Sequence, residues 1–192
     1  MFKSLFEQLY NLIFQPTKAW KALANEKENE VTNNDHFLKT YLYPIIGLIA
    51  LLAFLGVFFY KKEFDMQIAL RKTINISIAL FAGFYLASYL LSEIMVRYFS
   101  DGKYYKECQR FVGYSSALVY VMYVFLAIFP DFAFLQFILL YTVYIVWEGA
   151  SSYMQISDNQ KSKFTLATSA IVILSPIIIE KIMFLTMPGM RA

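Results

Sequence analysis

Ionisable side chains within or beside long apolar stretches are the residues of this sequence that could do chemistry. Glu93 and Arg97 stand four positions apart, a spacing that puts both on one face of a helix. Glu148 follows Trp147 near the end of another apolar stretch. Charged groups inside a bilayer are costly, so they usually face protein or water and mark functional sites. We therefore take Glu93, Arg97 and Glu148 as a candidate polar site near one membrane surface.

These carboxylates also have a plainer interpretation, in which they are hydrated at the bilayer surface and set the depth of their helices. None lies at the predicted middle of a span, where the cost of a charge is greatest. Glu180, near the end of the last apolar stretch, is followed by Lys181, whose long side chain can reach the surface. We favour this hydrated interpretation over a transport or binding pathway.

Residues suited to metal binding or nucleophilic catalysis are scarce. The single histidine, His36, lies in a polar stretch, and the single cysteine, Cys108, lies among basic residues. This excludes His-rich metal sites, Cys–His pairs and an internal disulfide. A Ser–Lys or all-carboxylate mechanism stays open, but no spacing supports one. We predict no catalytic residue, no metal and no cofactor, and a net charge of +3 gives no argument for a nucleic-acid partner.

The distribution of apolar residues predicts the fold class. Of 192 residues, 59% are hydrophobic and 16% are charged, and the mean hydropathy is +0.50. The apolar residues form long blocks almost free of charge, and one bilayer crossing needs roughly 20 such residues. We predict an all-α, polytopic membrane helical bundle with about five transmembrane helices. The predicted spans are residues 41–60, 74–96, 111–129, 132–153 and 164–186.

The number five depends on Pro130-Asp131, which interrupts the apolar stretch of residues 111–147. As one helix this stretch would be roughly 55 Å long at about 1.5 Å per residue, nearly twice the hydrocarbon thickness. Proline removes a helical hydrogen-bond donor and clashes with the preceding turn. We therefore expect a tight hairpin there.

The N-terminal residues 1–40 form a separate cytoplasmic or interfacial segment ahead of a membrane domain of residues 41–187. Apolar residues at helical spacing in 2–14 predict an amphipathic helix, too short to span and suited to the headgroup region. We expect Lys3 and Trp20 to act as interfacial residues. Residues 25–36 are polar and are expected to be solvated.

Basic residues outside the spans predict the orientation. With the N-terminus inside, eleven Lys and Arg residues lie on the cytoplasmic side and six on the other. The positive-inside rule therefore favours a cytoplasmic N-terminus. We expect the membrane to be the cytoplasmic (inner) membrane. The margin is modest because the first outer loop contains four basic residues: Lys61, Lys62, Arg71 and Lys72.

Ala79, Gly83 and Ala87 form a stripe of small residues at every fourth position of the second span. Small residues let helix backbones approach closely in lipid. We favour helix packing within the monomer, and a homodimer face is the alternative.

Short segments spread along the chain resemble, in their order, the Yip family of Ypt/Rab-interacting five-span membrane proteins, and specifically its bacterial branch. They are Ile13-Phe14-Gln15-Pro16-Thr17-Lys18-Ala19-Trp20, Tyr41-Leu42-Tyr43-Pro44, Asp101-Gly102-Lys103, Phe111-Val112-Gly113-Tyr114-Ser115 and Trp147-Glu148-Gly149. Related sequences often carry a proline soon after Tyr-Ser, where this chain has Ser116-Ala117-Leu118. The resemblance implies a five-span topology without an established activity.

Two functional hypotheses from different classes follow. The leading one is a non-enzymatic membrane protein that scaffolds partners or shapes the bilayer, with basic residues contacting anionic headgroups. Its partners would be membrane lipids, and other membrane proteins or a second copy of the chain stay open. The alternative is a small transporter or lipid-handling protein that uses Glu93, Arg97 and Glu148 near the cytoplasmic side. A transport route predicts a water-accessible cavity that reaches those carboxylates.

Overall fold

The computed structural model describes residues 2–29, 34–60, 65–99 and 105–186, and every regular element in these ranges is a helix. The predicted Asp101-Gly102-Lys103 loop and the predicted end at residue 187 lie outside the described residues. The helices are α1 (Phe2–Phe14), α2 (Pro16–Asn29), α3 (Asn34–Phe37), the π-helical turn η1 (Leu38–Leu42), α4 (Tyr43–Tyr60), α5 (Met66–Tyr98), α6 (Tyr105–Ser115), α7 (Ala117–Ile128), the 3₁₀-helix η2 (Pro130–Tyr141), α8 (Thr142–Ser152) and α9 (Asp158–Thr186).

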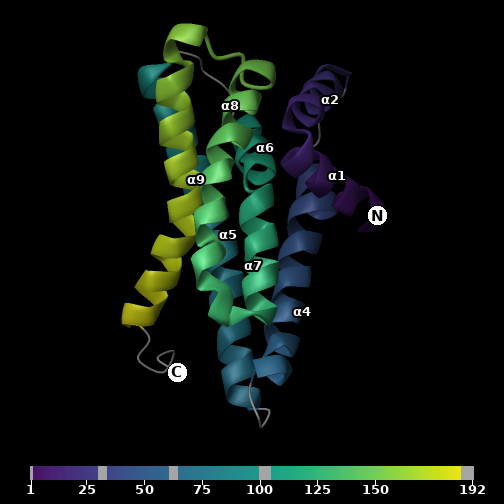
Figure 1. Ribbon diagram of the computed structural model, residues 1–192. Coiled ribbons are helices and arrows are strands. Elements are labelled where there is room, and N and C mark those ends of the chain that lie inside the picture. Colours follow the sequence, from purple (N-terminus) through teal and green to yellow (C-terminus); the bar gives the residue numbers. More distant parts are fainter. Residues whose placement is uncertain (1, 30–33, 61–64, 100–104, 187–192) are drawn as a thin grey trace.

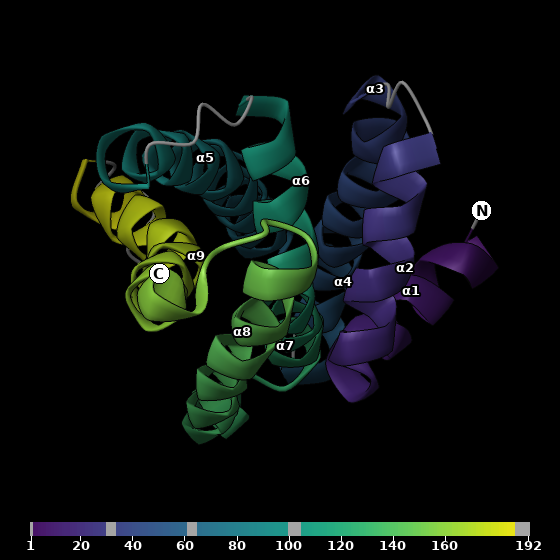
Figure 2. The same cartoon turned by 90° about the horizontal axis from the view of Figure 1, so that it is seen from above.

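The helices form an elongated bundle (Figure 1). Seen from one end, α5 and α9 lie together on one side, α6, α7 and α8 occupy the middle, and α4 lies with α1 and α2 on the other side (Figure 2). Contacts along the chain agree with this view, because α5 packs on both α9 and α4, and α4 packs on α7.

Four stretches of the described chain are long and apolar enough to cross a membrane, and the bent pair α6–α7 makes a fifth. The four are Asn34–Val57, Met66–Tyr98, Phe134–Ser152 and Asp158–Thr186. The predicted class, an all-α polytopic bundle with about five spans, is therefore confirmed. One detail differs, because Arg71 and Lys72 were assigned to a loop and instead lie inside α5. Asp65 caps this helix by accepting hydrogen bonds from the amides of Gln67 and Ile68, at 2.8 and 3.2 Å.

The chain reverses direction between α7 and η2, where we predicted a hairpin (Figure 1). The amide of Phe129 closes α7 by donating to the carbonyl of Phe125 at 2.9 Å, and Pro130 begins the next helix. The amine of Lys72 donates to the carbonyl of Ala127 at 3.0 Å. Carbonyls in the last turn of a helix have no partner within the helix, so Lys72 stabilises the end of α7.

The third span bends by 46° between α6 and α7, although no proline lies there. Ser116, at the break, donates its hydroxyl to the carbonyl of Val112 at 2.7 Å, four residues earlier. A serine that bonds back to this carbonyl commonly bends a helix. This hydroxyl bond lies at the bend of the third span.

The small-residue stripe of α5 faces α9 inside the monomer. Ala79, Gly83 and Ala87 are all buried. A Cβ atom on Gly83 would lie 2.8 Å from both the Cα and the backbone nitrogen of Pro176 in α9. A cavity of about 10 Å³ lies beside this contact and is bordered by Ser116 as well. The glycine thus lets two spans touch at backbone distance, opposite the bend of the third.

Candidate functional site

Trp20 of α2 is fully buried against the membrane bundle. Its indole nitrogen donates to the carbonyl oxygen of Ile145 in α8 at 2.9 Å. Its ring centroid lies 4.9 Å from that of Phe111 in α6 and 5.5 Å from that of Tyr153, which follows α8. The N-terminal segment is therefore docked on α6 and α8 through this side chain.

Two glycines make room for the aromatic rings that pack here. A Cβ atom on Gly149 would lie 2.6 Å from Cε2 of Trp20 and 2.7 Å from Cε2 of Phe111. A Cβ atom on Gly113 would overlap the ring of Phe37, which also packs on Tyr114 with centroids 5.1 Å apart. We call the six rings gathered around these glycines the aromatic cluster: Trp20, Phe37, Tyr41, Phe111, Tyr114 and Tyr153.

The aromatic cluster corrects the role predicted for Trp20. An interfacial anchor contacts lipid headgroups, whereas Trp20 has no exposed area. The amphipathic pattern of the residues around Trp20 indicated that one helix face is buried. That pattern is the same whether protein or lipid covers the face. The cluster also brings together segments that are far apart in the sequence, namely those around Pro16-Thr17-Lys18-Ala19-Trp20, Tyr41, Phe111 and Gly149.

Asn34 is an exception to the expectation that residues 25–36 are solvated, whereas Asp35 and His36 beside it are exposed. The side-chain amide of Asn34 donates to the side-chain oxygen of Gln109 in α6 at 2.8 Å, and both side chains are buried. The pair joins positions 75 apart in the chain, and no local pattern in the sequence signals it. Residues 30–33 of the predicted stretch lie outside the described residues.

Arg110 is a second polar group that the sequence reasoning missed, because it was counted as a loop residue. It lies inside α6 with 8% of its surface exposed. Within the described part of the chain, its Nε atom has no hydrogen-bond partner. Tyr153 lies just beyond the end of α8. Burial raises the pKa of its phenol, the nearby guanidinium of Arg110 lowers it, and the resulting pKa is about 12. A buried guanidinium nitrogen that lacks a hydrogen-bond partner is a costly arrangement.

The predicted polar site comes together only in part. The guanidinium of Arg97 lies 3.0 Å from the carboxylate of Glu93, and the pair is solvent-accessible, with Arg97 71% exposed. Among the described residues, no hydrogen bond or ion pair joins Glu148 of α8 to either partner. The arrangement is a surface ion pair on α5, of a kind that is typically worth less than about 1 kcal/mol.

α1 has two apolar faces. Leu5, Leu9 and Leu12 are buried against the protein. Phe6, Tyr10 and Phe14, which we call the outer aromatic row, are 53%, 55% and 66% exposed. Lys3 is exposed on the same helix. The hydroxyl of Tyr141 donates to the carbonyl of Ile13 at 3.0 Å and ties the end of α1 to the bundle.

The site residues described above make packing contacts and one surface ion pair. Within the described residues, no group of three or more His, Cys, Asp or Glu side chains is placed to hold a metal ion. A helical bundle with four or five candidate spans and a docked N-terminal segment defines a polytopic α-helical membrane protein.

The family follows from comparison with known proteins. The model of the Yip1 domain matches residues 10–179, which is most of the chain and includes every ring of the aromatic cluster. The chain therefore belongs to the Yip1 domain family, as the short segments of the sequence indicated. Comparison with curated proteins and with solved structures finds no match.

Proposed function

We propose that this Yip1-domain protein is a non-enzymatic organiser of the membrane that shapes one leaflet through α1. The observation that supports this is the outer aromatic row, which is exposed on a helix whose other face is fixed to the bundle. Aromatic side chains on a helix of this kind insert at the boundary between headgroups and acyl chains. Lys3 adds attraction to anionic headgroups.

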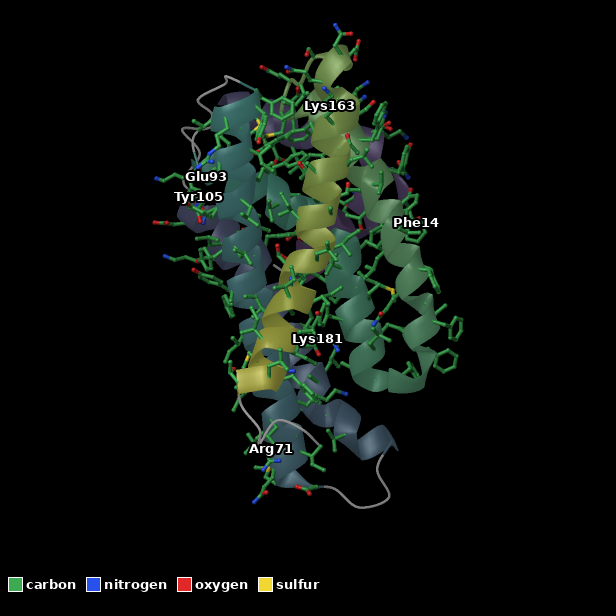
Figure 3. All side chains as sticks on the ribbon, turned by 90° about the vertical axis from the view of Figure 1, so that its left-hand side faces the viewer. Phe14, Arg71, Glu93, Tyr105, Lys163 and Lys181 are labelled. Atoms are coloured by element: carbon green, nitrogen blue, oxygen red, sulfur yellow. The ribbon has the colours of Figure 1, made fainter. Side chains whose placement is uncertain are left out.

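The position of α1 limits the insertion to one leaflet. Phe14, the last member of the outer aromatic row, lies toward the same end of the bundle as Glu93 and Tyr105 (Figure 3). Arg71 and Lys181 lie toward the other end. A helix that adds side-chain volume to one leaflet and none to the other favours curvature toward that leaflet.

The proposal also states which membrane holds the protein and on which side of that membrane α1 lies. The distribution of Lys and Arg favours a cytoplasmic N-terminus. The inner membrane of a bacterium is proposed on the resemblance to the bacterial branch of the family. On that orientation α1 lies in the cytoplasmic leaflet. A reporter fused after Arg191 should then be accessible from the non-cytoplasmic side of the membrane. Activity of that reporter in the cytoplasm would contradict the orientation.

The alternative, a small transporter, has less support from the geometry. The carboxylate of Glu93 is engaged by Arg97 at the surface. Among the described residues, a cavity of about 320 Å³ lies at this end of the bundle, and neither Glu93 nor Glu148 lines it. Other membrane proteins or a second copy of the chain stay open as partners of the organiser.

Reconstitution tests the proposed function. We expect the full chain, inserted into vesicles of phosphatidylethanolamine and phosphatidylglycerol, to narrow or tubulate them, as measured by electron cryomicroscopy. The combined changes Phe6→Ser, Tyr10→Ser and Phe14→Ser remove the outer aromatic row and should abolish the narrowing.

The control variants are Phe134→Ser and Phe137→Ser. They remove aromatic side chains that are 62% and 78% exposed on a spanning segment. These variants should narrow vesicles as the unchanged chain does. Equal narrowing by the α1 variant and the unchanged chain, at equal insertion and equal thermal stability, would overturn the proposal.

A further inference from the structure

A groove lies on the surface of the bundle between the end of α5 and the beginning of α9. Its volume is about 320 Å³, and its lining is mostly apolar. The residues that line it are Ile94, Tyr98, Phe99, Gln160, Lys163 and Ala167. The ring of Phe99 meets that of Phe164 edge to face, with centroids 5.5 Å apart, and this contact holds the two helices together beside the groove.

Among the described residues that line it, the groove contains one basic group and no acidic group. Lys163 is exposed on the second turn of α9, and within the described residues no ion pair is formed by its amine. The neighbouring cations are engaged. Arg97 pairs with Glu93, and the amine of Lys161 lies 4.4 Å from the centre of the Trp147 ring and 3.2 Å from the hydroxyl of Ser151. Of the described residues in the lining, Lys163 is therefore the one that carries charge.

The composition of the groove matches a lipid more closely than a soluble ligand. Lys163 and Gln160 offer donors for phosphate and ester oxygens near the end of the bundle, while Ile94 and Ala167 lie further along each helix toward its apolar centre. From the end of the bundle toward its centre, the groove therefore has polar groups first and apolar groups next, as a phospholipid has its headgroup before its acyl chains. The volume is in the range of small-molecule sites, which begins near about 300 Å³.

We propose that this groove binds one anionic phospholipid of the adjacent leaflet, with its phosphate at Lys163 and Gln160 and the start of one acyl chain along Ile94 and Ala167. The groove lies on the α5–α9 side of the bundle, and α1 lies on the opposite side (Figure 2). The proposal therefore goes beyond the shaping of the membrane by α1, and either idea can fail without the other.

Native mass spectrometry of the purified full chain, titrated separately with phosphatidylglycerol and phosphatidylcholine, tests the proposal. We expect tighter retention of the anionic lipid, and Lys163→Gln should weaken it by about fivefold, the ratio that about 1 kcal/mol per basic residue gives. Lys161→Gln is the matched control, since it removes an equal charge two residues away. It should leave the retention unchanged.

A second pair of variants tests the groove itself. Ala167→Trp fills the groove and should abolish retention of phosphatidylglycerol, whereas Leu166→Trp, at a neighbouring position that is 66% exposed, should not. Thermal unfolding of each variant shows that its fold is kept. The proposal is overturned by equal retention of the two lipids, by equal effects of Lys163→Gln and Lys161→Gln, or by retention that survives Ala167→Trp. Capture of a membrane protein that competes with the lipid at this face would also overturn it.

Discussion

The indole nitrogen of Trp20 and the carbonyl oxygen of Ile145 lie 2.9 Å apart, although 125 positions separate the two residues in the chain. The first of them belongs to the N-terminal segment and the second to the fourth span. Through this bond and the packing of Trp20 against the tilted ring of Phe111, the segment before the first span becomes part of the bundle. Stability, rather than lipid binding, is therefore the property that changes at Trp20 should affect first.

Trp20→Ala should lower the free energy of unfolding by about 3–5 kcal/mol, the usual cost of removing a buried tryptophan. Titration with denaturant in detergent micelles, followed by circular dichroism, measures the change. The chain has one other tryptophan, Trp147, which is 37% exposed. Trp147→Ala is the matched control and should cost about 1 kcal/mol or less. Equal losses from the two changes would show that Trp20 is not the docking residue.

Gly149→Ala should destabilise the protein by about 1–3 kcal/mol, because the added methyl group overlaps the rings of Trp20 and Phe111. Gly47→Ala should instead stabilise the protein, because a Cβ atom added at Gly47 would meet no neighbouring atom within 4 Å. There alanine is favoured over glycine within a helix by about 0.5–1 kcal/mol. The near-ultraviolet circular dichroism of Gly149→Ala should also change. An unaltered spectrum and unaltered stability would argue against the packing described for the aromatic cluster.

Gly83→Ala separates packing within the monomer from packing between copies. The added Cβ would meet the backbone of Pro176, which cannot rotate away as a side chain can. We expect a loss of about 1–3 kcal/mol in the stability of the monomer. Light scattering after gel filtration should show the same oligomeric state as the unchanged chain. A dimer that dissociates while the monomer keeps its stability would instead identify the stripe as a homodimer face.

Arg110→Met should raise the free energy of unfolding, since it introduces an apolar side chain of similar length in place of a buried one whose Nε atom has no hydrogen-bond partner among the described residues. The expected gain is about 1–3 kcal/mol, the cost of leaving such a donor buried. Arg97→Met serves as the comparison, because it removes an exposed ion pair worth about 0.5 kcal/mol or less. A large loss of stability in Arg110→Met would show that the guanidinium is satisfied in the folded protein.

Local patterns in the sequence were sufficient for the fold class and for part of the site. Long apolar blocks predicted the spans, because the hydrocarbon thickness sets the length of a crossing. Proline chemistry predicted the hairpin at Pro130. The spacing of Glu93 and Arg97 predicted their ion pair, since both residues lie on the same face of one helix.

Contacts between distant segments were beyond the same reasoning. The amphipathic pattern around Trp20 looks the same whether lipid or protein covers its apolar face. Asn34 reads as a solvated residue until Gln109 is placed beside it by the packing of α3 on α6. The bend at Ser116 was not predictable either, because Ser77 and Ser88 make the same kind of hydroxyl bond within the unbroken helix α5.

The docking of Trp20 also sets an order of events during synthesis. Chains emerge from the ribosome at about 5–20 residues per second, so Trp20 is made roughly 6–25 s before Ile145. Throughout that interval the hydrogen-bond acceptor on α8 and the space beside Gly149 do not yet exist. The N-terminal segment must wait elsewhere, and the apolar faces of α1 suit it to wait on the membrane surface. Residues of α1 and α2 are thus translated before α8 and reach their final place only after it.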